Sequence, residues 1–108
     1  MNTYTRPHVK HIISTIWRNV TINRLLSRRF DDAEAALRLM QNIIEVTIKG
    51  NATGLTYVHA LTTTTDNNVK QHHFSLMNDQ LGCVISGIIE VNRGYILSLS
   101  MHDEWNEK

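Results

Sequence analysis

The sequence predicts an α+β domain with N-terminal helices, at about residues 6–20 and 32–45, packed on a C-terminal antiparallel β-meander of about four strands at 54–101. Three observations predict this class. Apolar residues before position 50 recur with a helical period, and residues after 54 are rich in threonine, valine, isoleucine and leucine. Short clusters of Asn, Asp and Gly separate the later runs. Because 108 residues is a usual size for one domain, we expect residues 1–108 to share a single core.

The first predicted helix carries apolar residues on one face between positions 9 and 20. At about 100° per residue these side chains fall within an arc of about 140°. Thr5 is placed to cap the N-terminus, and Pro7 suits the first turn, where N–H groups lack helical partners. Because the stretch is rich in β-branched residues, a β-hairpin over residues 11–30 remains an open alternative. The apolar face consists of Val9, Ile12, Ile13, Ile16, Trp17 and Val20.

The second predicted helix follows an acidic N-cap, supplied by Asp31 or Asp32. Asp31 followed by Glu34 resembles a capping box, and both acids suit the positive end of the helix dipole. Lys49 and Gly50 are typical of a helix end, although the apolar residues before them alternate as in a strand. The apolar face consists of Ala33, Ala36, Leu37, Met40, Ile43 and Ile44.

Strand-like runs follow at residues 54–63, 70–77, 83–91 and 95–101. Turn-forming clusters lie between them at 66–68, 78–82 and 92–94. Consecutive runs joined by such short turns predict an antiparallel meander.

The last hairpin permits a prediction of strand register. A three-residue turn with Gly94 in the left-handed position would give the hairpin one apolar face. A two-residue turn would scatter apolar groups over both faces. The preferred pairs are Leu97 opposite Ile89 and Met101 opposite Ile85. Val84, Ile88 and Ile96 then lie on the opposite face, which becomes a candidate docking surface.

The net charge of +1 is unevenly distributed along the chain. Residues 1–30 contain six Lys or Arg and no acid, whereas the rest contains five basic and ten acidic residues. Such a basic segment points to an acidic partner, so nucleic-acid binding is the alternative function. A basic element that neutralises an acidic one within the fold would give the same composition. The candidate phosphate contacts are Lys10, Arg18, Arg24, Arg28 and Arg29.

The histidines form no recognisable metal-binding motif. His8 and His11 have the spacing of one helix face, and His59 falls opposite His73 or Phe74 if the turn at 66–68 is central. Neither arrangement has the further ligands that a zinc site needs, so we expect no metal and no cofactor.

Two catalytic arrangements form a minor alternative, a small histidine-dependent enzyme. Cys83 and His102 would face each other only if Asn92 and Arg93 formed a two-residue turn, which is the disfavoured register. Lys70, His72 and His73 would form a general acid–base site. The sequence contains no phosphate-binding glycine loop, nucleophile elbow or dinucleotide fingerprint, so a catalytic role is less favoured than a binding one.

The sequence shows no apolar stretch long enough for a signal peptide or a membrane span. A single cysteine cannot form an intrachain disulfide, which fits a reducing compartment. We therefore expect a soluble cytoplasmic protein with no membrane contact.

The preferred function is a non-enzymatic protein-binding module of the inhibitor, antitoxin, immunity or regulatory type. It would act through its sheet and its acidic C-terminal tail, and an acidic surface suits a basic, nucleic-acid-handling partner protein. Trp105, among acidic residues, either folds back onto the sheet or is an exposed aromatic anchor of the kind that protein interfaces use. Self-association as a homo-oligomer remains open. The predicted protein-binding residues are Trp105, Asp103, Glu104, Ile88 and Ile96.

Overall fold

Helix α1 (Arg6–Ile22) begins where the sequence predicts. The hydroxyl of Thr5 accepts a hydrogen bond from the backbone N–H of His8 at 3.2 Å, and Pro7 occupies the first turn. Helical geometry runs unbroken to Ile22 in the computed structural model, which describes residues 5–104. The helix is therefore confirmed, and the β-hairpin alternative over residues 11–30 is wrong. The buried face consists of Val9, Ile12, Ile16 and Val20.

The connection after α1 contains only a single short 3-10 turn, η1 (Leu25–Ser27). Arg24, which precedes η1, has a left-handed backbone with φ of 53°. Because this conformation ends the helix, Arg24 and Arg28 do not lie on one helix face, as they would if the helix continued through them. Leu25 is fully buried and anchors the connection in the core.

Helix α2 (Ala33–Gly50) is capped by Asp32, whose carboxylate accepts a hydrogen bond from the N–H of Ala35 at 2.6 Å. Asp31 is therefore not the cap, and a capping box from Asp31 to Glu34 does not form. The helix continues past its predicted end, because the residues that alternate in the sequence keep the helical period. Ile44 and Ile48 are buried while Val46 is 69% exposed.

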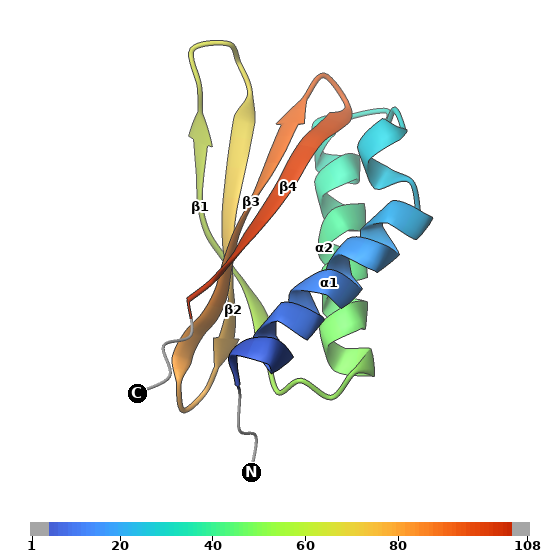
Figure 1. The fold of residues 1–108 in the computed structure, drawn as a ribbon. Helices are drawn as coiled ribbons and strands as arrows, with labels where there is room; N and C mark the ends of the chain where they lie inside the picture. The colour runs from blue at the N-terminus through green and yellow to red at the C-terminus, as the bar shows by residue number, and fades with distance from the viewer. Residues whose placement is uncertain (1–4, 105–108) are drawn as a thin grey trace.

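The sheet has the order β1-β2-β3-β4, and every pair is antiparallel. Both helices lie on the same side of it, as Figure 1 shows, so the structure confirms the predicted α+β class. We call the helix-covered side the inner face and the opposite side the outer face. The strands are β1 (Thr56–Thr64), β2 (Lys70–Asn78), β3 (Gly82–Asn92) and β4 (Tyr95–Asp103).

The predicted register of the last hairpin is wrong. Asn92 pairs with Tyr95 across a two-residue turn, and both turn residues, Arg93 and Gly94, have positive φ of 52° and 82°. Such a turn matches the twist of the flanking strands. Leu97 does not pair, because a bulge displaces it after Glu90 pairs with Ser98 and Val91 with Ile96. The actual pairs are Ile89 with Leu99, Gly87 with Met101 and Ile85 with Asp103.

This bulge explains how a two-residue turn avoids scattering apolar groups. The bulge leaves the Leu97 side chain 52% exposed. It also lets the Ile96 side chain face the core, where it is only 1% exposed. Val84, at a second irregularity between β2 and β3, is fully buried as well. Ile96 and Val84 therefore belong to the core, and their assignment to a docking surface is wrong.

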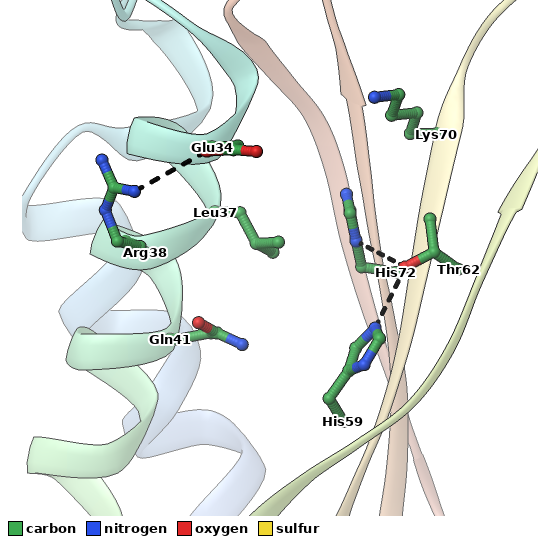
Figure 2. A pocket seen from close by; sticks show the side chains of 8 residues that line it. All are labelled: Glu34, Leu37, Arg38, Gln41, His59, Thr62, Lys70 and His72. Atoms are coloured by element: carbon green, nitrogen blue, oxygen red, sulfur yellow. Dashed lines mark hydrogen bonds and ion pairs between the residues drawn. The ribbon is translucent and has the colours of Figure 1, made fainter.

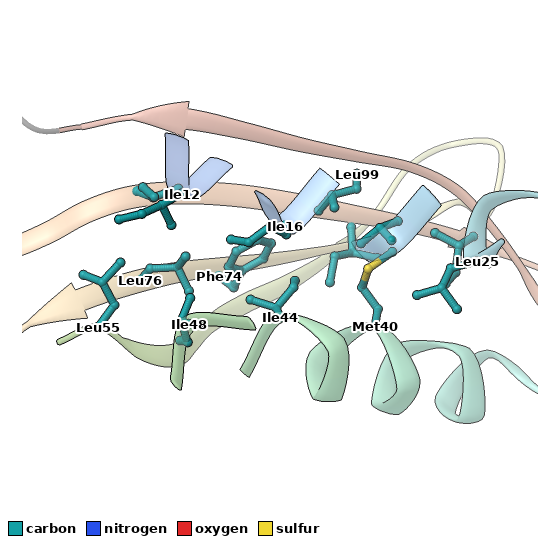
Figure 3. Close-up of a cluster of buried hydrophobic side chains, with 14 of the residues drawn as sticks. Ile12, Ile16, Leu25, Met40, Ile44, Ile48, Leu55, Phe74, Leu76 and Leu99 are labelled. Carbon is teal, nitrogen blue, oxygen red and sulfur yellow. The ribbon is translucent and has the colours of Figure 1, made fainter. Parts of the chain in front are cut away.

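One hydrophobic core fills the space between the helices and the inner face of the sheet (Figure 3). Phe74 lies at its centre and is 1% exposed. The position opposite Phe74 on β3 is Gly87, where a Cβ atom would overlap the Phe74 ring. The core therefore requires a glycine in the middle of a strand, where glycine is otherwise unfavourable.

Candidate functional site

The outer face of the sheet carries a shallow groove of about 290 Å³, which we call the outer groove. No helix of residues 5–104 lies over this face (Figure 1). Leu61 from β1 and Ile88 from β3 line it together with the almost fully buried Phe74, and His73 and His102 line it as well. An uncovered apolar patch among polar groups is typical of protein-binding surfaces. Ala60, Ser75 and Ser86 also line the groove.

A line of hydrogen bonds crosses the outer face near the groove. The Gln71 amide donates to Glu90 at 3.1 Å, and the Ser98 hydroxyl donates to the other carboxylate oxygen at 2.6 Å. These bonds, first from Ser98 and then from Gln71, lower the pKa of Glu90. The three residues tie β2, β3 and β4 together, so this part of the outer face is held in one arrangement.

A second cavity, which we call the inner cleft, lies between α2 and the inner side of β1 and β2, with a volume of about 450 Å³ (Figure 2). Leu37 and Gln41 point from α2 toward the two histidines, while Arg38 lies on the far side of the helix and pairs with Glu34 at 3.9 Å. The cleft is lined by Glu34, Leu37, Arg38 and Gln41 from the helix and by His59, Thr62, Lys70 and His72 from the strands.

The Thr62 hydroxyl connects the two imidazoles of the inner cleft. Its oxygen lies 3.0 Å from Nε2 of His59 and 3.0 Å from Nδ1 of His72. Partial burial lowers the pKa of His72, and the neighbouring His59, Lys70 and His73 add to the effect. The lowered pKa favours the neutral form of His72, and the cleft offers hydrogen-bonding groups to a ligand or a partner side chain.

The predicted acid–base group of Lys70, His72 and His73 is not assembled. Lys70 and His72 line the inner cleft, whereas His73 lines the outer groove on the other side of the sheet. Successive residues of a strand point to opposite faces, so neighbours in sequence cannot share such a site. The predicted opposition of His59 and Phe74 is confirmed, with Leu61 opposite His73 after a bulge at Ala60.

The other sequence-predicted chemical groups are also placed apart. Cys83 pairs with Met77 on β2, and His102 pairs with Ser86, so the cysteine and histidine do not face each other across β3 and β4. His8 and His11 share a small pocket of about 130 Å³ between α1 and the end of α2. Within residues 5–104, no three His, Cys, Asp or Glu side chains gather as they would around a metal ion.

The predicted protein-binding residues fall in different places. Ile88 is half-buried on the outer face, as expected, and Ile96 is in the core. Asp103 ends β4, and Glu104 extends the strand, since its N–H donates to the carbonyl of Val84 at 2.9 Å. The Glu104 carboxylate accepts a hydrogen bond from Ser86 at 2.7 Å, beside the outer groove. Trp105 lies outside the described residues.

The predicted nucleic-acid contacts lie on α1 and on the connection that follows it. Lys10 and Arg18 are exposed on α1. Arg24, Arg28 and Arg29 are exposed on the connection, where the Arg28 guanidinium lies 5.0 Å from the ring centre of Phe30. These three arginines form a local basic surface at one end of the helical layer.

Sequence reasoning missed the residues that β1 contributes to the two cavities. Thr62 and Leu61 are adjacent in sequence, yet one lines the inner cleft and the other the outer groove. The bulge at Ala60 decides which side each residue faces, and no turn residue or glycine marks it in the sequence. The exposed apolar side chains of β1, at Val58 and Leu61, therefore could not be assigned to a face beforehand.

Comparison with known proteins adds no relative. The chain matches no protein family model, no curated protein and no solved structure. Among the helices of residues 5–104, none combines the length and the apolar character needed to cross a membrane.

Proposed function

We propose that this protein is a non-enzymatic protein-binding module, of the inhibitor, antitoxin, immunity or regulatory type, that docks a partner protein on the outer face of its sheet. The observation that carries the proposal is the uncovered outer groove, which Leu61 of β1, His73 of β2, Ile88 of β3 and His102 of β4 line together. In a two-layer domain one sheet face is left open to solvent, and apolar side chains there stay available to a partner.

The acidic end of β4 supports the same surface. Glu104 is hydrogen-bonded to Ser86, which lines the outer groove, whereas Asp103 pairs with the core residue Ile85 and belongs to the other face. Carboxylates at the rim of an apolar patch favour a basic partner, through faster association and exclusion of acidic proteins. A basic nucleic-acid-handling protein in the cytoplasm is the partner class that we propose.

The experiment is a pull-down from source-cell lysate with the immobilised full chain, in nuclease-treated and untreated halves. Ile88→Lys places a charge in the middle of the outer groove, and Val46→Lys makes the same kind of change on the exposed side of α2. We expect one protein to be retained at fixed stoichiometry by the wild type and by Val46→Lys, and to be reduced at least about ten-fold by Ile88→Lys. Equal retention by both variants would refute the outer face as the docking surface.

Nucleic-acid binding is the second candidate, because Arg24, Arg28 and Arg29 are all exposed on one connection. If the retained material disappears with nuclease, this candidate replaces the first. Binding should then weaken steeply with salt, since displaced counterions dominate such affinity. The triple change of these arginines to alanine should abolish binding without unfolding the chain, as thermal melting would show.

A further inference from the structure

Strand β1 forms an open edge of the sheet. It pairs only with β2, and no other strand of residues 5–104 lies along its second edge (Figure 1). All but one of its nine residues are exposed, and they include Val58 at 44% and Leu61 at 50%. The outward backbone N–H and C=O groups of such a strand are ready to pair with another strand.

The composition of β1 makes it compatible with a second copy of itself. The strand reads TYVHALTTT and contains no Asp, Glu, Lys, Arg or Pro. Proteins usually protect a long edge strand with a lysine, a proline, a bulge or a covering element; β1 has a bulge at Ala60 but no lysine or proline, and no element of residues 5–104 covers its second edge. Because no charge on β1 would meet its own copy, identical strands placed side by side do not repel one another.

We propose that two copies of this chain associate by antiparallel pairing of β1 with β1, which joins their sheets into one of eight strands. A two-fold axis between the two copies makes the interface isologous, so that each residue meets the same complementary residue twice. The pairing shares Ala60 and Leu61 with the outer groove, but Ile88 lies two strands away from this edge, so a change at Ile88 distinguishes the dimer from the protein-binding function.

The faces of β1 select the register of this pairing. Tyr57 stacks on the core residue Phe74, and His59 and Thr62 line the inner cleft, so these three residues face inward. Thr64 faces inward too, because it pairs with Lys70 of the inner cleft. The outward residues are Ala60 and Leu61, which line the outer groove, and Val58 and Thr63, which pair with Ser75 and Gln71.

An axis between Ala60 and Leu61 keeps every inward residue opposite an inward one. It places His59 opposite Thr62, Tyr57 opposite Thr64 and Val58 opposite Thr63 of the other copy. Moving the axis by half a residue sets Ala60 opposite itself and the inward His59 opposite the outward Leu61. Such a register is disfavoured, because paired residues of neighbouring strands point to the same face of a sheet. In the matched register the bulge is not an obstacle, because the two outward residues Ala60 and Leu61 meet the same two residues of the second copy.

The test is sedimentation velocity of the full chain over a wide concentration range, with two opposite charges placed beside the axis. Ala60 is small and exposed, so Ala60→Lys and Ala60→Glu remove no packing. The wild type should pass from monomer to twice the monomer mass as concentration rises. Each variant alone should need at least about ten-fold more protein to dimerise, since like charges meet at the axis. An equal mixture of the two variants should regain the wild-type behaviour.

Two controls separate this proposal from the protein-binding function. Leu97→Lys changes an exposed leucine on β4 and should dimerise like the wild type, and so should Ile88→Lys. A wild type that stays monomeric at every concentration overturns the proposal, and so does a mixture of the Ala60 variants no better than either alone. Loss of the dimer in Ile88→Lys or Leu97→Lys would place the interface elsewhere and equally overturn it.

Discussion

The two edge strands of the sheet have different surroundings. Along β4, the connection between the helices covers the start of the edge: the N–H of Phe30 donates to the carbonyl of Gly94 at 2.8 Å, and Arg29 forms a bridge with Tyr95. Leu25 of η1 is buried beside the same strand. Along β1, no described element takes this place, and the side chains stay exposed.

The difference arises from tertiary packing rather than from the strand sequences. Strand β4 reads YILSLSMHD and β1 reads TYVHALTTT, so both are almost free of charge. What protects β4 is the segment that crosses from α1 to α2, which docks at the β3–β4 turn. An edge strand can therefore be protected by a distant part of the chain, and the unprotected edge marks where another chain can add.

The largest expected effect is on the free energy of unfolding, when a leucine near each edge of the sheet is truncated to alanine. Leu25→Ala should lower the free energy of unfolding by about 3 kcal/mol, because it leaves a cavity under β4. Leu61→Ala should cost less than about 0.5 kcal/mol, because half of that side chain is already in water. Urea denaturation at a protein concentration that keeps the chain monomeric measures both. Similar losses would show that the two edges are equally packed.

A smaller effect is expected where the connection meets the β3–β4 turn. Gly94 has φ of 82°, and a Cβ there would overlap the carbonyl of Phe30, so Gly94→Ala should cost about 2 kcal/mol. Gly50, at the end of α2, has no atom close to its missing Cβ, so Gly50→Ala is the matched control. Thermal melting compares the two. If Gly94→Ala melts like the control, the docking of Phe30 does not depend on this glycine.

The smallest expected effect is a dependence of the protein's stability on pH, caused by His72 on β2, the strand next to the open edge. Burial lowers the pKa of His72 below its ordinary 6.5, so the unfolded chain binds the proton first as pH falls through 6.5. Stability should therefore fall on acidification below that value and be unaffected by His72 above it. The titratable groups around His72 are His59, Lys70 and Glu34 in the inner cleft, the adjacent His73 on the other side of the sheet, and Arg38, which pairs with Glu34 on α2.

Denaturation midpoints measured between about pH 5 and about pH 8 give the slope of stability against pH. His72→Asn should flatten it on the acid side, and His11→Asn on α1 controls for the loss of any one imidazole. An unchanged slope in His72→Asn would mean that another group carries the dependence.

Local patterns in the sequence predicted the elements, and tertiary packing set the registers. Asp32 and Thr5 cap helices through neighbours three residues away, so the signals are local and visible. The bulges at Ala60 and Leu97 carry no such signal, since they arise from fitting strands to the core. Each bulge reverses the face of the residues that follow it. Ile96 and Leu99 lie on the two sides of the Leu97 bulge and so both face the core, whereas strict alternation predicts opposite faces for them; the pairing of His59 and His72 through Thr62 likewise has no signal in the sequence.

The hydroxyl shared by the two imidazoles has a consequence for the polarity of the inner cleft. A threonine hydroxyl carries one hydrogen, so it can donate to only one of the two rings, and when both rings are neutral and it does donate, it accepts from the other ring. If Nε2 of His59 donates to the Thr62 oxygen, Nδ1 of His59 carries no hydrogen, and His72, which accepts from Thr62 at Nδ1, carries its hydrogen on Nε2. If Thr62 rotates, both tautomers reverse together. In either state the two remaining ring nitrogens comprise one donor and one acceptor, and their order can be exchanged without any change in net charge.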